Sequence, residues 1–251
     1  VEGHTVDNQG QQTPIDPLVP QDRSNKNGQP YSLGHGVWGL AVGALDDSVG
    51  REVVAAAYGR IGVFDATSLT LRDDGQGGDL VKDAPFGGAT VAEPHWLYSR
   101  PRRLQIAEVY PSNAGAEVLL VTQHNHLIVL DKDLEVVAEH SEGGIVDVLV
   151  GPTPVMKLGN PLLDQPVYLL SARGHLASLE FQPNAVDPLN MGRLSAVSLL
   201  QYGVPRDLEA VTWVGSSGLQ LAALYTDHPN IRRSIRIFNA SQLDLIQEFG
   251  H

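Results

Sequence analysis

The sequence predicts an all-β protein, and three observations lead to this prediction. From Val37 onward, short apolar runs rich in Val, Ile and Leu alternate with turn residues, a pattern typical of β-strands. Four segments of this kind align with one another at spacings of about 50 to 65 residues. No stretch convincingly shows the spacing of an amphipathic helix, and the best exception, residues 193–202, fits a strand equally well. Repeats of four antiparallel strands at this spacing are typical of blades, so we expect a β-propeller with about four recognisable four-stranded blades.

Residues 1–31 precede the repeats and are rich in Gly, Pro, Asn, Asp and Gln. Such a segment buries too little apolar surface to offset the entropy of ordering, which predicts an extended N-terminal arm or linker. Ile15, Leu18 and Val19 are its only sizeable apolar group and could hold the arm against the body or a partner; a mobile leader is the alternative. The propeller domain is expected over residues 32–251.

A β-hairpin is the clearest part of each repeat. Gly59, Asn125 and Gly174 occupy one position in three copies, and Gly and Asn tolerate the positive φ of tight hairpin turns. Each hairpin closes with a bulky apolar residue followed by an acid or amide, namely Asp65, Asp131, Glu180 and Asn239. The hairpins are predicted at residues 52–65, 117–131, 166–180 and 219–239, the last with a longer turn.

An apolar strand is predicted before each hairpin, and its unbroken apolar run indicates burial between neighbouring blades. These first strands are expected at residues 37–45, 104–110, 145–150 and 208–214. Trp38 and Trp213 fall in two of them, which predicts core positions for both. Fourth strands are expected at residues 69–72, 134–138 and 243–246, with residues 193–202 as the candidate in the third copy.

The repeat consists of an acidic loop, Glu-Val-Val, a small apolar strand, a Gly turn, a second apolar strand and Asp, as in residues 46–65. This pattern resembles the FG-GAP or VCBS repeat of integrin-α-type propellers and of many secreted bacterial proteins. It is similar, more loosely, to pyrroloquinoline-quinone-type propeller repeats. The resemblance covers residues 37–249 and implies a fold rather than a function.

The resemblance also implies a calcium loop between the first two strands of a blade. In the first repeat Asp46, Ser48 and Glu52 match such a loop, whereas only Asn113 and Glu117 match in the second. Calcium prefers six to eight oxygen ligands, several of them carboxylates. Ca²⁺ is therefore a possible ligand of the first loop, and a plain acidic turn is the alternative.

Closure of the ring is open at this point, because a closed ring is what protects blade edges. The chain could form a small closed ring of four or five blades or part of a larger propeller completed by another chain. Residues 75–103 could also supply a degenerate extra blade. We expect a single closed ring.

The composition excludes several classes of function. The 17 basic and 29 acidic residues give a net charge of −12, which argues against nucleic acid and anionic membranes as partners. The absence of Cys excludes thiol catalysis, disulfides and thiolate metal sites. No apolar run is long enough for a transmembrane helix, and no signal peptide is visible at the start of the sequence. A mature secreted protein would look the same, so an extracellular or periplasmic location is our expectation.

Residues 77–103 interrupt the repeat as an inserted loop, and long loops on rigid scaffolds often hold binding residues. The candidate ligand- or partner-binding residues are Glu93, His95, Trp96, Tyr98, Arg100, Arg102 and Arg103. Trp and Tyr can stack on sugars or anchor a protein, and Arg binds carboxylates. His95, Tyr98 and Arg100 are also candidates for proton abstraction next to a uronate carboxylate, by analogy with propeller-fold polysaccharide lyases. Plain packing beneath the loop is the alternative.

Two further clusters favour structural roles. His124 and His126 flank a hairpin turn with no nearby carboxylate, which argues against a metal site. Arg232, Arg233 and Arg236 could seat an acidic partner, but Arg236 fits the outward position of an alternating strand and the other two fit a solvated turn.

These observations lead to three functional hypotheses. The first is a non-catalytic propeller acting as a binding or assembly module for a protein or a glycan. The second is a carbohydrate-active enzyme that uses the loop at residues 93–103. The third is a structural subunit of a larger complex, with the arm lying along a neighbour.

Overall fold

A computed structural model describes residues 3–6, 12–15, 37–46, 50–57, 60–83, 101–109, 115–140, 144–151, 166–181, 189–195, 204–211, 218–226 and 233–249. Near the N-terminus, β1 (Gly3–Val6) and β2 (Gln12–Ile15) form an antiparallel hairpin. The other strands of the described residues form four sheets of four strands each.

The first sheet contains β3 (Val37–Gly43), β4 (Glu52–Ala57), β5 (Arg60–Asp65) and β6 (Val81–Asp83). The second contains β7 (Pro101–Ala107), β8 (Glu117–Thr122), β9 (Leu127–Leu130) and β10 (Val136–His140). The third contains β11 (Ile145–Val150), β12 (Val167–Ser171), β13 (Leu176–Phe181) and β14 (Leu189–Leu194). The last contains β15 (Val204–Val211), β16 (Gln220–Thr226), β17 (Arg233–Asn239) and β18 (Leu245–Phe249).

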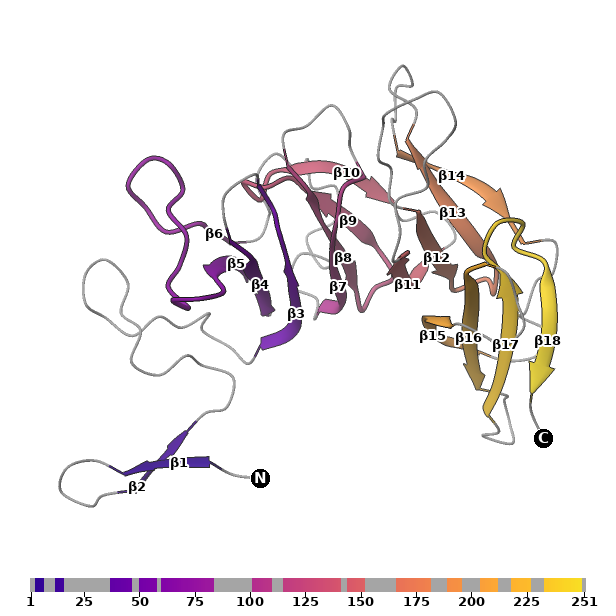
Figure 1. Ribbon diagram of the computed structural model, residues 1–251, viewed down its shortest axis with the longest axis horizontal. Helices are drawn as coiled ribbons and strands as arrows, with labels where there is room; N and C mark the ends of the chain where they lie inside the picture. The colour runs from indigo at the N-terminus through magenta and orange to yellow at the C-terminus, as the bar shows by residue number, and fades with distance from the viewer. Residues whose placement is uncertain are drawn as a thin grey trace.

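Each sheet is an antiparallel meander in which strands consecutive in sequence are paired side by side. The four predicted repeats thus correspond to four sheets, and the all-β prediction is confirmed. The sheets stand in sequence order along an open arc, with the first and last sheets at its two ends (Figure 1). They do not close into a ring, so the small closed ring is not formed by the described residues.

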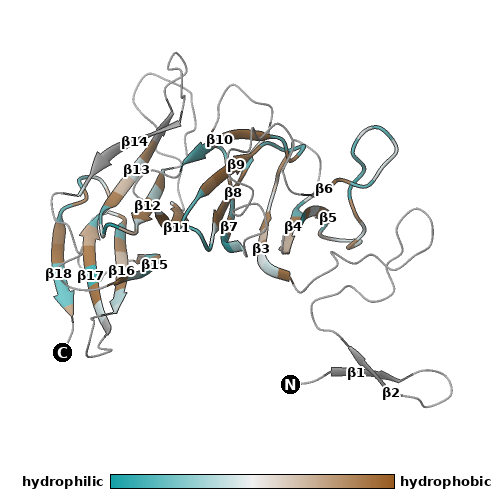
Figure 2. Cartoon of the chain, turned by 180° about the vertical axis from the view of Figure 1, so that it is seen from behind, coloured by the Kyte–Doolittle hydropathy of each residue, from teal (hydrophilic) through white to brown (hydrophobic). Residues whose placement is uncertain are grey.

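The core lies between successive sheets. In β8, Val118 and Leu120 pack in the cluster shared with the first sheet, whereas Leu119 and Val121 pack in the cluster shared with the third. Since neighbouring residues of a strand point to opposite faces, a strand between two sheets must be apolar at every position. Figure 2 shows this hydrophobic character along β8 and β9. A third cluster joins the third and last sheets.

The hairpin turns follow the predicted chemistry where they are described. Asn125 and Gly174 adopt positive φ, at 64° and 78°; Gly59 lies outside the described residues. The acid or amide that ends the third strand has a local role in three sheets. Oδ1 of Asp65, Asp131 and Asn239 accepts hydrogen bonds from backbone N–H groups of the following turn, as Asx turns do.

The fourth strand of the first sheet differs from its prediction at residues 69–72. Only Leu71 forms a bridge, to Phe64, and the regular strand is β6. Between them, Oδ1 of Asp74 accepts hydrogen bonds from the N–H groups of Gln76 and Gly78, which holds a local loop. The edge strand is therefore split, because its outer side has no ladder to keep it continuous.

The other boundaries shift by a few residues. The fourth strand of the third sheet is β14, at Leu189–Leu194, which starts before the predicted residues 193–202 and overlaps them at Arg193 and Leu194. Residues 196–202 lie outside the described residues. The inner strand β7 starts at Pro101, so Arg102 and Arg103 belong to a strand. Residues 84–100 lie outside the described residues. No helix in the described part of the chain is long and apolar enough to cross a membrane.

Candidate functional site

The two ends of the arc present apolar surface. On β3, alternate residues point in opposite directions: Ala41 packs in the core shared with the second sheet, while Trp38, Leu40 and Val42 are 51%, 58% and 59% exposed. Because β3 packs against another described sheet on the Ala41 side alone, Trp38 on its other side is not the core residue that the sequence predicts. We call Trp38, Leu40 and Val42 the first end face.

The last sheet repeats this arrangement at the other end. Ser234 and Arg236 of β17 are buried, whereas Ile235 between them is 42% exposed; Ile237, farther along the face of Ile235, is buried. Ile235 pairs with Phe249 of β18, and Phe249 is exposed as well. Val204 of β15 is exposed and pairs with Thr226. We call Val204, Ile235 and Phe249 the last end face.

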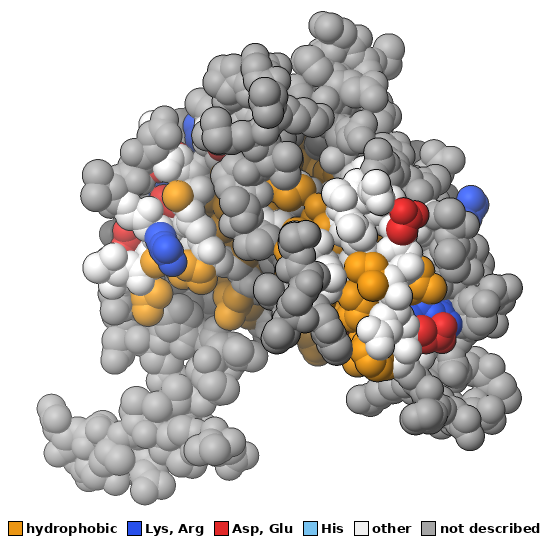
Figure 3. Space-filling view, turned by 45° about the vertical axis from the view of Figure 1, so that its right-hand side comes forward, with side chains coloured by type: hydrophobic (Ala, Val, Ile, Leu, Met, Phe, Trp, Pro, Cys, Tyr) orange, Lys and Arg blue, Asp and Glu red, His pale blue; other side chains and the backbone are white. Residues whose placement is uncertain are grey.

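The exposed apolar side chains whose burial the structure describes lie in the two end sheets. Among the residues that the structure describes, the exposed large hydrophobic side chains are Trp38, Leu40, Val42, Leu69, Val204, Ile235, Leu245, Ile246 and Phe249. None of these belongs to the second sheet or to the part of the third sheet with described side chains, which leaves out β14. Figure 3 shows hydrophobic side chains gathered on the right, where the last sheet comes forward. Such concentration of apolar surface is typical of an interaction site.

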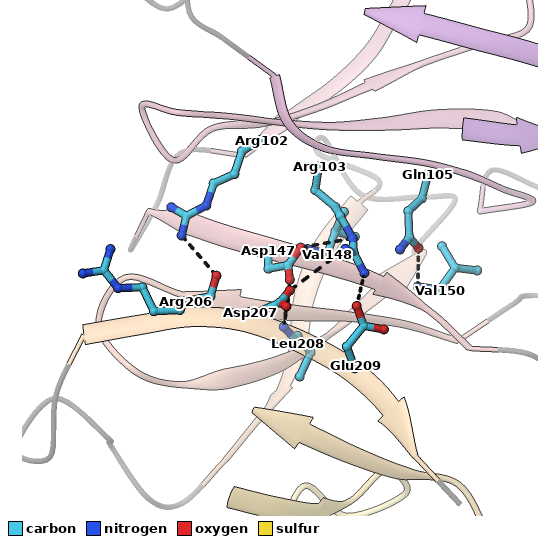
Figure 4. Close-up of polar contacts among 10 residues, drawn as sticks. All are labelled: Arg102, Arg103, Gln105, Asp147, Val148, Val150, Arg206, Asp207, Leu208 and Glu209. Atoms are coloured by element: carbon cyan, nitrogen blue, oxygen red, sulfur yellow. Dashed lines mark hydrogen bonds and ion pairs between the residues drawn. The ribbon is translucent and has the colours of Figure 1, made fainter. Parts of the chain in front are cut away.

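A charged cluster lies on the inner strands, where three sheets meet (Figure 4). Arg103 of β7 reaches Asp147 of β11 at 3.5 Å (Nε to Oδ1) and Glu209 of β15 at 2.9 Å (Nη2 to Oε1). Oδ2 of Asp147 accepts a hydrogen bond of 2.8 Å from the Leu208 N–H. Asp207 lies 4.0 Å from Arg103. The cluster therefore connects the second, third and last sheets through one guanidinium and one buried carboxyl.

Burial sets the protonation of this cluster. It raises the pKa of the Asp147 carboxyl to about 7, and the hydrogen bond with Asp207 acts in the same direction. The Arg103 charge and the Leu208 N–H lower this pKa without outweighing burial. For Arg103, burial alone would lower the pKa of the guanidinium, but Asp147 and Glu209 raise it overall. Burial lowers the pKa of the neighbouring Arg102.

Asp147 should make the protein less stable as the pH rises. Its folded-state pKa is above the ordinary value of 3.8, so the folded chain holds a proton that the unfolded chain has released. Between about pH 5 and 7 we expect the free energy of unfolding to fall by up to about 2 kcal/mol. Urea unfolding across this range should show the fall in the wild type and a flatter profile in Asp147→Asn. Asp244 is exposed in the turn before β18 and is the matched control, so Asp244→Asn should keep the wild-type profile. An Asp147→Asn profile as steep as the wild type would contradict the assignment.

Two of the seven predicted binding residues are described, and both lie on β7. Arg103 is engaged in the charged cluster, and Arg102 donates from Nη2 to the Arg206 carbonyl at 3.2 Å and from Nη1 to Asn125 Oδ1 at 3.4 Å. Both side chains thus connect sheets within the chain. Glu93, His95, Trp96, Tyr98 and Arg100 lie outside the described residues.

The residues of the predicted calcium loop have protein partners where they are described. Asp46 forms an ion pair of 2.9 Å with Arg72. Glu52 is buried, and its Oε2 accepts a hydrogen bond of 2.9 Å from the Leu45 N–H. Glu117 is also buried and accepts from Val109 at 2.9 Å in the same way. Ser48 lies outside the described residues, and calcium at this loop stays a prediction.

The Arg232–Arg236 cluster differs from its prediction at one position. Arg236 is 1% exposed and not outward. It donates to Glu248 at 2.7 Å and lies over the ring of Tyr225, 5.4 Å from the centroid. Register explains this, because Arg236 pairs with Ala223 on the face that packs against the third sheet. Arg232 and Trp213 lie outside the described residues.

Sequence reasoning missed the end faces and the acidic partners of Arg103. The alternation of Trp38, Leu40 and Val42 with small residues (Gly39, Ala41 and Gly43) was a usable signal, because small residues allow close packing on one face alone. A Cβ on Gly43 would come within 3.0 Å of Ile106 in the next sheet. Asp147, Asp207 and Glu209 carried no local signal, since their partner is far away in the sequence.

Comparisons with known proteins agree with the fold. No family model matches the chain, and no curated protein matches it. Among solved structures, the chain is similar to one described as the Dos1 propeller, with 13% identity and a TM-score of 0.56. The match covers 85% of this chain and 49% of that one, so the chain spans about half the length of that propeller. The chain therefore has a β-propeller fold, while the FG-GAP/VCBS resemblance stays a prediction.

Proposed function

We propose that this chain is a non-catalytic β-propeller module that binds another polypeptide through the end faces of its arc. The observation that carries the proposal is that the exposed large hydrophobic residues, among the side chains whose burial the structure describes, lie in the two end sheets. Burying exposed side chains such as Trp38 and Leu40 contributes about 25 cal/mol for each Å² of apolar surface removed from water. In the second and third sheets this contribution comes from a neighbouring sheet on either side.

A polypeptide is the partner that this surface fits best. The first end face is a row of aromatic and aliphatic side chains along β3. The last end face takes one such side chain from each of β15, β17 and β18. Cores of protein interfaces have this character, being rich in aromatic residues and depleted in charge. The enzyme hypothesis would depend on His95, Tyr98 and Arg100, outside the described residues, and no observation favours it.

Photo-crosslinking tests this function. A benzophenone amino acid replaces Leu40 in one chain and Leu69 in another. Both leucines are exposed in the first sheet, but Leu69 lies in the turn after β5 and not on the end face. Irradiation of the chain in extract of its source cells should give a polypeptide adduct at position 40 and none at position 69. Equal labelling at both positions, or no polypeptide adduct at position 40, would contradict the proposal.

A further inference from the structure

We infer that the polypeptide bound at the end faces is a second copy of this chain, and that two chains together close a ring of eight sheets. The inference rests on the proposed function and names its partner. Within the chain, successive described sheets always pack in the same sense, with one kind of face toward the preceding sheet and another kind toward the following sheet.

Every contact between the four described sheets joins two unlike faces. In β8, Val118 and Leu120 point toward the preceding sheet, and Leu119 and Val121 point toward the following one. In β12 the preceding sheet is contacted by Val167 and Leu169, and the following one by Tyr168 and Leu170. Each inner sheet therefore has a face for its predecessor and a different face for its successor.

The two end faces are the members of this series that no other described sheet covers. On the face of Leu40, Ala55 and Phe64 are buried in a small cluster within the first sheet itself. In the first sheet, Val54 and Ala56 of β4 contact the following sheet. The opposite, outward face of the first sheet therefore corresponds to the face with which an inner sheet contacts the sheet before it. In the last sheet, Leu221 and Ala223 of β16 contact the preceding sheet. The outward face of the last sheet therefore corresponds to the face with which an inner sheet contacts the sheet after it. The last end face of one copy is thus the same kind of surface as those that already pack on a following sheet.

The amount of chain supports a second copy. The match to the Dos1 propeller covers 85% of this chain but 49% of that one. About half of that chain therefore has no counterpart in this one. A second copy supplies this missing half. The two copies then form two identical head-to-tail contacts, in which the last end face of each copy covers the first end face of the other, and no end face stays exposed. Head-to-tail contacts give closed rings when the rotation closes and open filaments when it does not.

The test uses two variants, each with one end face damaged. Leu40→Asp places a charge on the first end face and Ile235→Asp places one on the last. Light scattering coupled to size exclusion should give two-chain particles for the wild type and single chains for each variant alone. An equimolar mixture of the two variants should again contain two-chain particles, because the last end face of one meets the first end face of the other. Leu69→Asp is the matched control and should behave as the wild type.

Other outcomes overturn the inference. A single-chain mass for the wild type at every concentration excludes the second copy, and masses above two chains exclude the closed ring. Dissociation by Leu40→Asp but not by Ile235→Asp would mean that like faces pair. Circular dichroism checks the fold of each variant, and Leu40→Ser with Ile235→Ser replaces any variant that does not fold. If the wild type is a single chain but position 40 still crosslinks to a different polypeptide, the second copy is wrong and the proposed function stands.

Discussion

Replacing Gly115 with alanine is expected to destabilise the folded chain by about 3 kcal/mol or more. Gly115 has φ of 93°, where a side chain is strained, and an added Cβ would lie 2.2 Å from the carbonyl oxygen of Leu45. The same oxygen accepts a hydrogen bond of 3.0 Å from the Ala116 N–H. This contact joins the loop regions of the first and second sheets, so the clash would break it. Positive-φ strain alone costs about 1 to 3 kcal/mol.

Gly77 provides the matched control for this prediction. Its φ is 90°, but an added Cβ would meet nothing within 4 Å. Gly77→Ala should therefore cost only the backbone strain, about 1 kcal/mol. Urea unfolding at one pH measures both variants. Equal losses of stability would show that the contact between Gly115 and Leu45 does not constrain the fold.

Replacing Leu134 with alanine is expected to cost about 2 to 5 kcal/mol, the usual range for a fully buried leucine. Leu134 is 0% exposed in the core between the first and second sheets. It also has φ of 62° in the turn after β9, where its N–H donates to the Asp131 carbonyl at 3.0 Å. The turn therefore places an apolar side chain into the contact between two sheets, and its removal leaves a cavity there.

Leu69 is the equivalent turn residue of the first sheet and provides the comparison. Its φ is 55°, but its side chain is 37% exposed. Leu69→Ala should cost less than about 1 kcal/mol, because little apolar contact is lost. Thermal or urea unfolding of the two variants separates burial from turn geometry. Similar losses would mean that the turn, and not the core, determines the cost.

The sequence predicted the repeated hairpins because their determinants are local. Strand alternation and a Gly or Asn at a tight turn are visible within about fifteen residues, and Asn125 and Gly174 have the expected φ. The positions of edge strands were harder to predict from the sequence. The fourth strand of the first sheet is divided by a loop, and β14 begins before the predicted window. An edge strand pairs on one side only, so fewer contacts fix its position.

The functional surface could not be predicted from local pattern. The exposure of Trp38 depends on whether a sheet stands in front of β3, and that is a property of the whole arc. The burial of Arg236 depends on which face of β17 meets the third sheet. Arg103 and its acidic partners come together from three sheets, over more than a hundred residues of sequence. In each case the deciding neighbour is distant in the chain.

Hydroxyl-radical labelling of Trp38 as a function of protein concentration tests whether two copies of the chain close one ring. Oxidation of the peptide containing Trp38 should fall as the pure chain is concentrated, since the last end face of a second copy covers it. The peptide containing Leu69 should label equally throughout. Oxidation of Trp38 that stays the same from dilute to concentrated solution would contradict the claim that two copies close one ring.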